Sequence, residues 1–214
     1  NPFTEVRHGS LEDLLKRPLA VAVLADPGQL GKTVRQALEN WIRAGGTAVR
    51  FAGPLLAKET GDDGDREGAR DGGGPFLPVR LRQGDRVIGG AMSWSEPAKL
   101  ASFEAASPFH GLAVPDDVTV KRQVLAQPAL DLAEKTWARL DDGTPLVTGE
   151  RRGKGWLVLV HTTANAQWSN LPLSGLFVDM LRRLVALSQG VVTKAAGPPL
   201  DPLSTLDGFG RLGP

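Results

Sequence analysis

The chain has 214 residues, of which 41% are hydrophobic and 23% charged, a balance that predicts one soluble globular domain with a packed core. Its 25 Lys and Arg residues nearly cancel its 24 Asp and Glu residues, and no segment is strongly basic, which argues against nucleic-acid binding. The absence of cysteine excludes disulfides, thiolate zinc sites and cysteine nucleophiles.

Neither a membrane span nor a signal peptide is predicted for this chain. No apolar run approaches about 18 residues, and residues 1–10 lack a basic start followed by an apolar stretch. The chain begins without Met and ends in Gly-Arg-Leu-Gly-Pro. We therefore expect it to be a piece of a longer protein, whose anchoring to a membrane by another segment stays open.

A parallel βαβ unit is predicted near the N-terminus. Leu19 to Ala25 is a short continuous apolar run, which is typical of a strand buried on both faces. From Thr33 onward, apolar side chains recur at helical spacing until Gly45, which ends the helix because glycine tolerates a positive φ. Thr47 to Ala52 follows as a second strand, and the two strands of such a unit are parallel.

An antiparallel insertion is predicted next. Residues 57–75 have almost no apolar side chain to bury, so we expect a mobile surface loop there. Phe76 to Arg82 and Arg86 to Trp94 are extended segments on either side of Gln83-Gly84-Asp85, a pattern that favours a hairpin.

Four further strands and a closing helix complete the predicted domain. The strands are expected over Val118–Ala126, Lys135–Leu140, Pro145–Glu150 and Trp156–Thr162, and the last three could form a meander. Gly175–Ser188 has the broad apolar face of a helix. The domain is therefore expected to span residues 1–190, and the Pro- and Gly-rich residues 191–214 are predicted to be a linker tail.

The rim at the ends of the parallel strands is the predicted edge for a ligand or partner, because ligands of open α/β sheets bind beyond the strand carboxyl ends. Asp26 and Gly53 follow the first two strands, and His161 ends a later one. Each also has a structural interpretation. Asp26 and Gly53 could be ordinary turn residues, with Asp26 capping a helix, and His161 could be satisfied by a backbone group.

A polar and aromatic loop between the last strand and the closing helix belongs to the same predicted rim. It contains Asn165, Trp168, Ser169 and Asn170. Such a loop could contact a ligand or a partner, or it could be a helix entry that Trp168 pins in place.

A cryptic hydrolase is the alternative function. It would use His161 as the base, Ser93 or Ser95 as the nucleophile, and Asp26 or Glu96 as the orienting acid, all within hydrogen-bond reach. The surrounding Met-Ser-Trp-Ser-Glu is not a Gly-x-Ser-x-Gly elbow, so no nucleophile motif supports this alternative.

No cofactor and no metal are predicted. The three histidines, His8, His110 and His161, do not have the spacing of metal ligands. Gly31-Lys32-Thr33 opens a helix after a strand, but position 26, where a P-loop needs glycine, is aspartate.

Three segments, 23–54, 89–126 and 142–187, together resemble the soluble central region of bacterial membrane proteins with an N-terminal double-transmembrane, BatA-like region and a C-terminal domain of unknown function. The resemblance covers roughly residues 19–213, and Trp168–Phe177 is its most specific part. It implies a class I glutamine amidotransferase-like fold, which is a flavodoxin-like three-layer α/β sandwich, within a membrane-anchored parent protein.

The resemblance also implies lost catalysis. Active amidotransferases of this fold have a nucleophilic cysteine in a Gly-x-Cys-x-Gly elbow and a His-Pro-Glu motif at the end of a late strand. Here His161-Thr162-Thr163 stands where the histidine motif is expected, Thr163 replaces the glutamate, and no cysteine exists. Thioester chemistry is therefore excluded.

The resulting hypothesis is that the chain is a non-catalytic binding or assembly domain of a membrane-anchored protein at the cell envelope. The periplasmic side is favoured over the cytoplasmic side. Its partner would be a protein or a small ligand at the rim. A third alternative, a carbohydrate-binding relative of trehalose-utilisation-like proteins of the same fold, rests on analogy alone.

Overall fold

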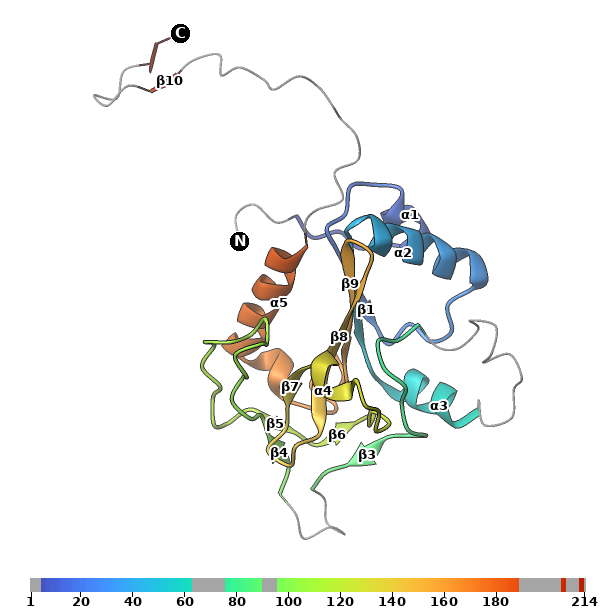
Figure 1. The fold of residues 1–214 in the computed structure, drawn as a ribbon, viewed down its shortest axis with the longest axis vertical. Coiled ribbons are helices and arrows are strands. Elements are labelled where there is room, and N and C mark those ends of the chain that lie inside the picture. Colours follow the sequence, from blue (N-terminus) through green and yellow to red (C-terminus); the bar gives the residue numbers. More distant parts are fainter. Residues whose placement is uncertain (1–4, 63–75, 90–95, 189–204, 207–211, 214) are drawn as a thin grey trace.

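The computed structural model describes residues 5–62, 76–89, 96–188, 205–206 and 212–213. A five-stranded sheet, ordered β1-β2-β9-β8-β7, lies at the centre and is seen nearly edge-on in Figure 1. Its strands are β1 (Val21–Ala25), β2 (Thr47–Phe51), β7 (Thr136–Arg139), β8 (Pro145–Arg152) and β9 (Gly155–Val160).

The sheet is mixed. β1, β2 and β9 are parallel to one another, whereas β8 and β7 continue the sheet in antiparallel pairs. The predicted parallel pairing of the first two strands is confirmed, and so is the predicted meander of β7, β8 and β9. The N-terminal strands β1 and β2 join the C-terminal meander through the pairing of β2 with β9, and this seam places Thr47 opposite Trp156 and Phe51 opposite Val160.

Helix α2 (Lys32–Ala44) covers one face of the sheet. Its apolar positions Leu38, Trp41 and Ile42 are buried in a cluster with side chains of β1, β2 and β9. The helix ends where the sequence predicted, because Gly45 has a φ of 129°, which glycine adopts without a steric penalty.

Helix α5 (Gly175–Leu187) covers the opposite face. The Ser174 hydroxyl caps it by accepting a hydrogen bond from the backbone N–H of Phe177 at 3.2 Å. The neighbouring β2 residues Ala48 and Val49 point to opposite faces, and they belong to the α2 cluster and the α5 cluster respectively. Figure 1 shows the result, with α2 and α3 on one side of the sheet and α5 on the other. The predicted α/β class, with helices on both faces of a central sheet, is therefore confirmed.

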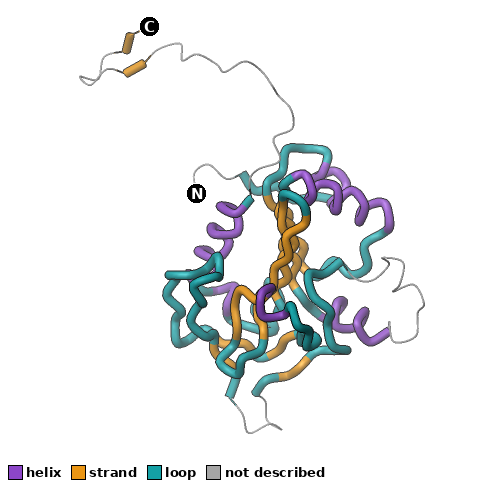
Figure 2. The backbone as a smooth tube through the Cα atoms, viewed as in Figure 1, coloured by secondary structure: helices purple, strands orange, loops and turns teal. Residues whose placement is uncertain are grey.

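Shorter elements complete the described chain. These are α1 (Leu11–Leu15), α3 (Pro54–Asp62), α4 (Leu132–Lys135), the 3-10 helix η3 (Leu171–Leu173), β3 (Arg86–Val87), β4 (Ala98–Lys99), β5 (Thr119–Val120), β6 (Arg122–Gln123), β10 (Thr205–Leu206) and β11 (Leu212–Gly213). Loops make up most of the described residues between α3 and β7, and they are drawn teal in Figure 2. No helix among the described residues is long and apolar enough to cross a membrane.

The predicted hairpin of residues 76–82 with 86–94 is wrong. Both segments pair with a later part of the chain instead of with each other: Leu81 bridges to Ala126, and β3 pairs with β6. Residues on both sides of the turn at 83–85 therefore pair with the same distant segment, residues 122–126. Residues 90–94 of the predicted hairpin lie outside the described residues.

Two other boundaries also differ from the prediction. The expected loop over residues 57–75 begins inside α3, which continues to Asp62, and residues 63–75 lie outside the described part. The expected strand 118–126 is divided into β5 and β6 because the backbone N–H groups of Lys121 and Arg122 both donate to the carbonyl oxygen of Trp168.

Of the tail 191–214, the structure describes only β10 and β11, which pair with each other.

Candidate functional site

The carboxyl ends of β1, β2 and β9 meet at one edge of the sheet, as the sequence predicted. Asp26 follows β1, Gly53 follows β2, and His161 follows β9. Parallel pairing continues past the strands, since the N–H of Ala52 donates to the Val160 carbonyl at 2.8 Å. This edge is the candidate rim.

Asp26 caps helix α3 across the rim. Its two carboxylate oxygens accept hydrogen bonds from the backbone N–H groups of Leu55 at 2.8 Å and Leu56 at 2.9 Å. Its backbone has a φ of 49°, a left-handed conformation that aspartate tolerates better than most residues. A Cβ atom at Gly53 would lie 2.6 Å from the Asp26 Cγ, so this close approach requires glycine. The capping interpretation of Asp26 is therefore confirmed.

His161 is fully buried and both of its ring nitrogens are hydrogen-bonded. Nδ1 lies 2.8 Å from the Val124 carbonyl oxygen, and Nε2 lies 3.0 Å from the Thr148 hydroxyl. A carbonyl can only accept, so Nδ1 carries the proton and Nε2 accepts from Thr148. Burial lowers the pKa of His161 to about 4, and the imidazole is therefore neutral near pH 7.

The partners that a hydrolase would need do not meet His161 in the described structure. Ser93 and Ser95 lie outside the described residues. Among the described residues, the Asp26 carboxylate is held by α3, and Glu96 is exposed beside a separate cleft of about 260 Å³. The ring of His161 instead ties β9 to β8 and to the chain after β6.

The loop before α5 fastens the insertion to the sheet. Trp168 is buried with side chains of α3 and β9, and the Arg122 guanidinium lies 5.7 Å from its ring centroid. The Asn170 side chain accepts from the Thr119 N–H and donates to the Asp117 carbonyl, each at 2.7 Å. These contacts agree with the interpretation of the loop as a pinned helix entry.

Few predicted rim residues have surface to offer a ligand. The side chain of Asn165 is exposed, and its amide oxygen accepts from the Gln167 N–H at 3.1 Å. Asp26 and Asn170 are half-buried, while His161 and Trp168 are buried. Most polar groups of the described rim are therefore bonded to other residues of the chain and are not available to a ligand.

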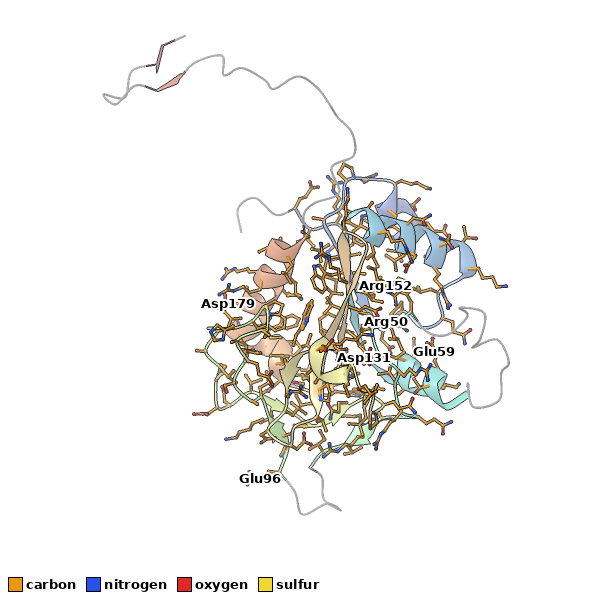
Figure 3. The ribbon with its side chains drawn as sticks, viewed as in Figure 1. Arg50, Glu59, Glu96, Asp131, Arg152 and Asp179 are labelled. Atoms are coloured by element: carbon orange, nitrogen blue, oxygen red, sulfur yellow. The ribbon has the colours of Figure 1, made fainter. Side chains whose placement is uncertain are left out.

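A buried arginine beside the rim was missed from the sequence. Arg50, the residue before the last in β2, is 1% exposed and forms an ion pair with Glu59 of α3 at 3.3 Å. It also donates to the carbonyl oxygens of Gly28 and Phe76, each at 3.4 Å. Burial lowers the pKa of its guanidinium, although the Glu59 carboxylate opposes this change. Figure 3 shows Arg50 and Glu59 between the sheet and α3. The only signal in the sequence is one cation inside an apolar strand.

An open cleft of about 940 Å³ lies between α2 and the turn that joins β8 to β9. The side chain of Arg152 is at its centre: Nε and one terminal nitrogen donate to Glu150 and Glu39, each at 2.9 Å, and the other donates to the Leu77 carbonyl at 3.1 Å. Its guanidinium lies 4.8 Å from the Phe76 ring centroid. The residues lining this cleft, the α2 cleft, are Lys32, Arg35, Gln36, Glu39, Arg43, Phe76, Glu150, Arg151, Arg152 and Gly153.

Positive charge dominates the α2 cleft. Five of its lining residues are Lys or Arg, and two are Glu. Both glutamates are already shared between cations, since Glu39 also accepts from Arg43 at 2.8 Å and Glu150 also accepts from Lys135 at 2.9 Å. This site was not predicted from the sequence, because its cations come from one face of a helix and from the end of a strand some 110 residues later.

No protein-family model matches the chain, and no curated protein matches it significantly. Solved structures show the same fold. A cytoplasmic protein from Salmonella typhimurium aligns with a TM-score of 0.59 at 12% identity, over 86% of this chain and 76% of that one. A second, from S. typhimurium LT2, aligns with a TM-score of 0.57 at 13% identity, over 84% and 76%.

A β-galactosidase from Rahnella sp. R3 also contains a similar region. The TM-score is 0.52 at 17% identity, over 82% of this chain and 24% of the enzyme. The chain thus spans about a quarter of that protein. At these identities the likeness concerns the fold alone.

Proposed function

We propose that this chain is a non-catalytic binding or assembly domain of a membrane-anchored bacterial protein, built on a degenerate amidotransferase-like, flavodoxin-like three-layer sandwich. The observation that carries the proposal is the state of His161. This histidine stands where the resembled enzymes place their base, yet it is buried and both nitrogens are bonded to Val124 and Thr148. Its Nε2 accepts from the Thr148 hydroxyl, as a base does from a nucleophile, but both side chains are fully buried, so a substrate has no access to them.

The arrangement of helices and strands supports the fold assignment. Three parallel strands with α2 and α3 on one face and α5 on the other match the layers of a doubly wound domain. The antiparallel strands β8 and β7 depart from an all-parallel flavodoxin-like sheet. The departure lies on the side of β9 that is opposite β1 and β2.

Absence of hydrolysis is the first expected result. The purified chain should release no more p-nitrophenol from p-nitrophenyl acetate, and no more ammonia from glutamine, than buffer does. His161→Gln should behave identically, because the wild-type histidine takes no part in chemistry. A wild-type rate that His161→Gln and Ser93→Ala or Ser95→Ala abolish, with unchanged circular dichroism, would establish the hydrolase instead.

Location is the second expected result. The longer protein that contains this chain should sediment with membranes and resist extraction at alkaline pH. Protease added to spheroplasts should digest the domain, since we propose that it faces the periplasm. Recovery of the whole protein in the soluble fraction would contradict the membrane anchor, and protection in spheroplasts that is lost on lysis would place the domain in the cytoplasm.

A further inference from the structure

We propose that the α2 cleft binds an extended acidic segment of a partner protein. The inference rests on the proposed binding role and names the surface and the chemistry of the partner. The proposed binding surface is a cleft on the α2 side of the sheet and not the rim, where most side chains are buried or bonded within the chain.

The charge of the cleft is the first argument. Arg152 bridges Glu39 of α2 and Glu150 of β8, so the acids of the cleft are consumed in holding its central cation. Lys32 has no hydrogen-bond or ion-pair partner for its side chain within the described chain, and Arg151 bonds only the Gly153 carbonyl at 3.3 Å. The two glutamates thus do not balance the cations that line the cleft, and a ligand with carboxylates would neutralise the remaining positive charge.

The length of the cleft is the second argument. Lys32 and Arg43 lie at opposite ends of α2, which separates their backbones by about 16 Å at the helical rise. Arg151 and Arg152 lie across the cleft on β8. Cations at both ends suit a ligand with several charges along its length, and an extended chain of roughly five residues spans this distance.

The composition of the lining is the third argument. Seven of the ten described lining residues are charged. The one aromatic residue, Phe76, has Arg152 stacked on its ring. Small-molecule pockets are mostly apolar, and single-stranded nucleic acids need open aromatic faces for their bases. Among the described lining residues neither feature is present, so the cleft favours a polypeptide that offers carboxylates.

A peptide titration tests the inference. The probe is a fluorescein-labelled peptide of about twelve residues with glutamate at alternate positions, long enough to exceed the cleft. Its anisotropy is measured with the full chain at about 50 mM and about 200 mM salt, because screening should weaken the interaction. Lys32→Glu/Arg151→Glu reverses one exposed cation on each wall of the cleft. Lys121→Glu/Arg183→Glu reverses two exposed cations elsewhere and changes the net charge equally.

The expected result is binding by the wild type that falls about tenfold or more in the cleft variant and less than about twofold in the control. Equal losses in both variants would show a net-charge effect and overturn the site. No binding by the wild type, or binding of tripolyphosphate or an oligothymidylate in place of the peptide, would overturn the ligand class. Because hydrolysis is assayed separately, failure here leaves the non-catalytic proposal to be judged on its own test.

Discussion

Gly155→Ala is expected to destabilise the protein by about 3 kcal/mol or more, close to the upper end for added atoms in a packed core. A Cβ atom at Gly155 would collide with the carbonyl oxygens of Gly46 and Ile42, and would lie 3.0 Å from the Gly45 carbonyl carbon. These are backbone atoms, which cannot rotate away as a side chain can. The Gly46 carbonyl is further fixed because it accepts the Trp156 N–H at 3.1 Å.

Gly175→Ala is the matched control. Gly175 is the first residue of α5, and an added Cβ there meets no atom within 4 Å. Alanine should leave stability unchanged or raise it by up to about 1 kcal/mol, since it restricts the unfolded chain. Urea unfolding followed by tryptophan fluorescence gives both values. Similar midpoints for the two variants would mean that the approach of α2 to β9 is looser than the structure shows.

The second large effect is a loss of stability in acid caused by His161. Burial holds the pKa of this histidine at about 4 in the folded protein, against 6.5 in an unfolded chain. Between these values the unfolded state binds the extra proton, so stability decreases as pH falls from about 6.5 towards 4. The full decrease is roughly 3 kcal/mol, and the contribution of His161 to stability is complete above about pH 6.5.

His161→Gln isolates this contribution. A glutamine side chain can still donate to Val124 and accept from Thr148, but it does not titrate. We expect the variant to be less stable than the wild type at pH 7 and to lose less stability between pH 7 and pH 4.5. Carboxylates common to both proteins cancel in the comparison. If the free energy of unfolding changed with pH in the same way in both proteins, the pKa of His161 would not be lowered by folding, which would contradict its burial from solvent.

Elements whose determinants are local in sequence could be predicted. The spacing of Leu38, Trp41 and Ile42, followed by Gly45, identified α2 and its end. Helix α3 was missed because its cap comes from a distant turn: Asp26 binds N–H groups 29 and 30 residues later. The false hairpin has the same origin, since the segment with which residues 81 and 86–87 pair lies some 40 residues further on.

The candidate sites follow the same pattern. The order of strands and turns placed His161 at the end of β9, but its Nδ1 is bonded to the carbonyl oxygen of Val124, which lies 37 residues earlier. The periodic cations of α2 were readable as one helix face. Their role in a cleft required the position of β8, because Arg152 reaches α2 from 113 residues away.

The seam between β2 and β9 has a consequence for synthesis of the chain. These strands lie about a hundred residues apart, and Val49 and Phe51 become buried only when β9 and α5 are in place. On the ribosome, the first βαβ unit therefore emerges with the edge of β2 unpaired and one apolar face uncovered. Both stay exposed until nearly the whole domain has been synthesised. During that interval the edge of β2 is a template for wrong strand pairing, and this unit is therefore a binding target for a chaperone.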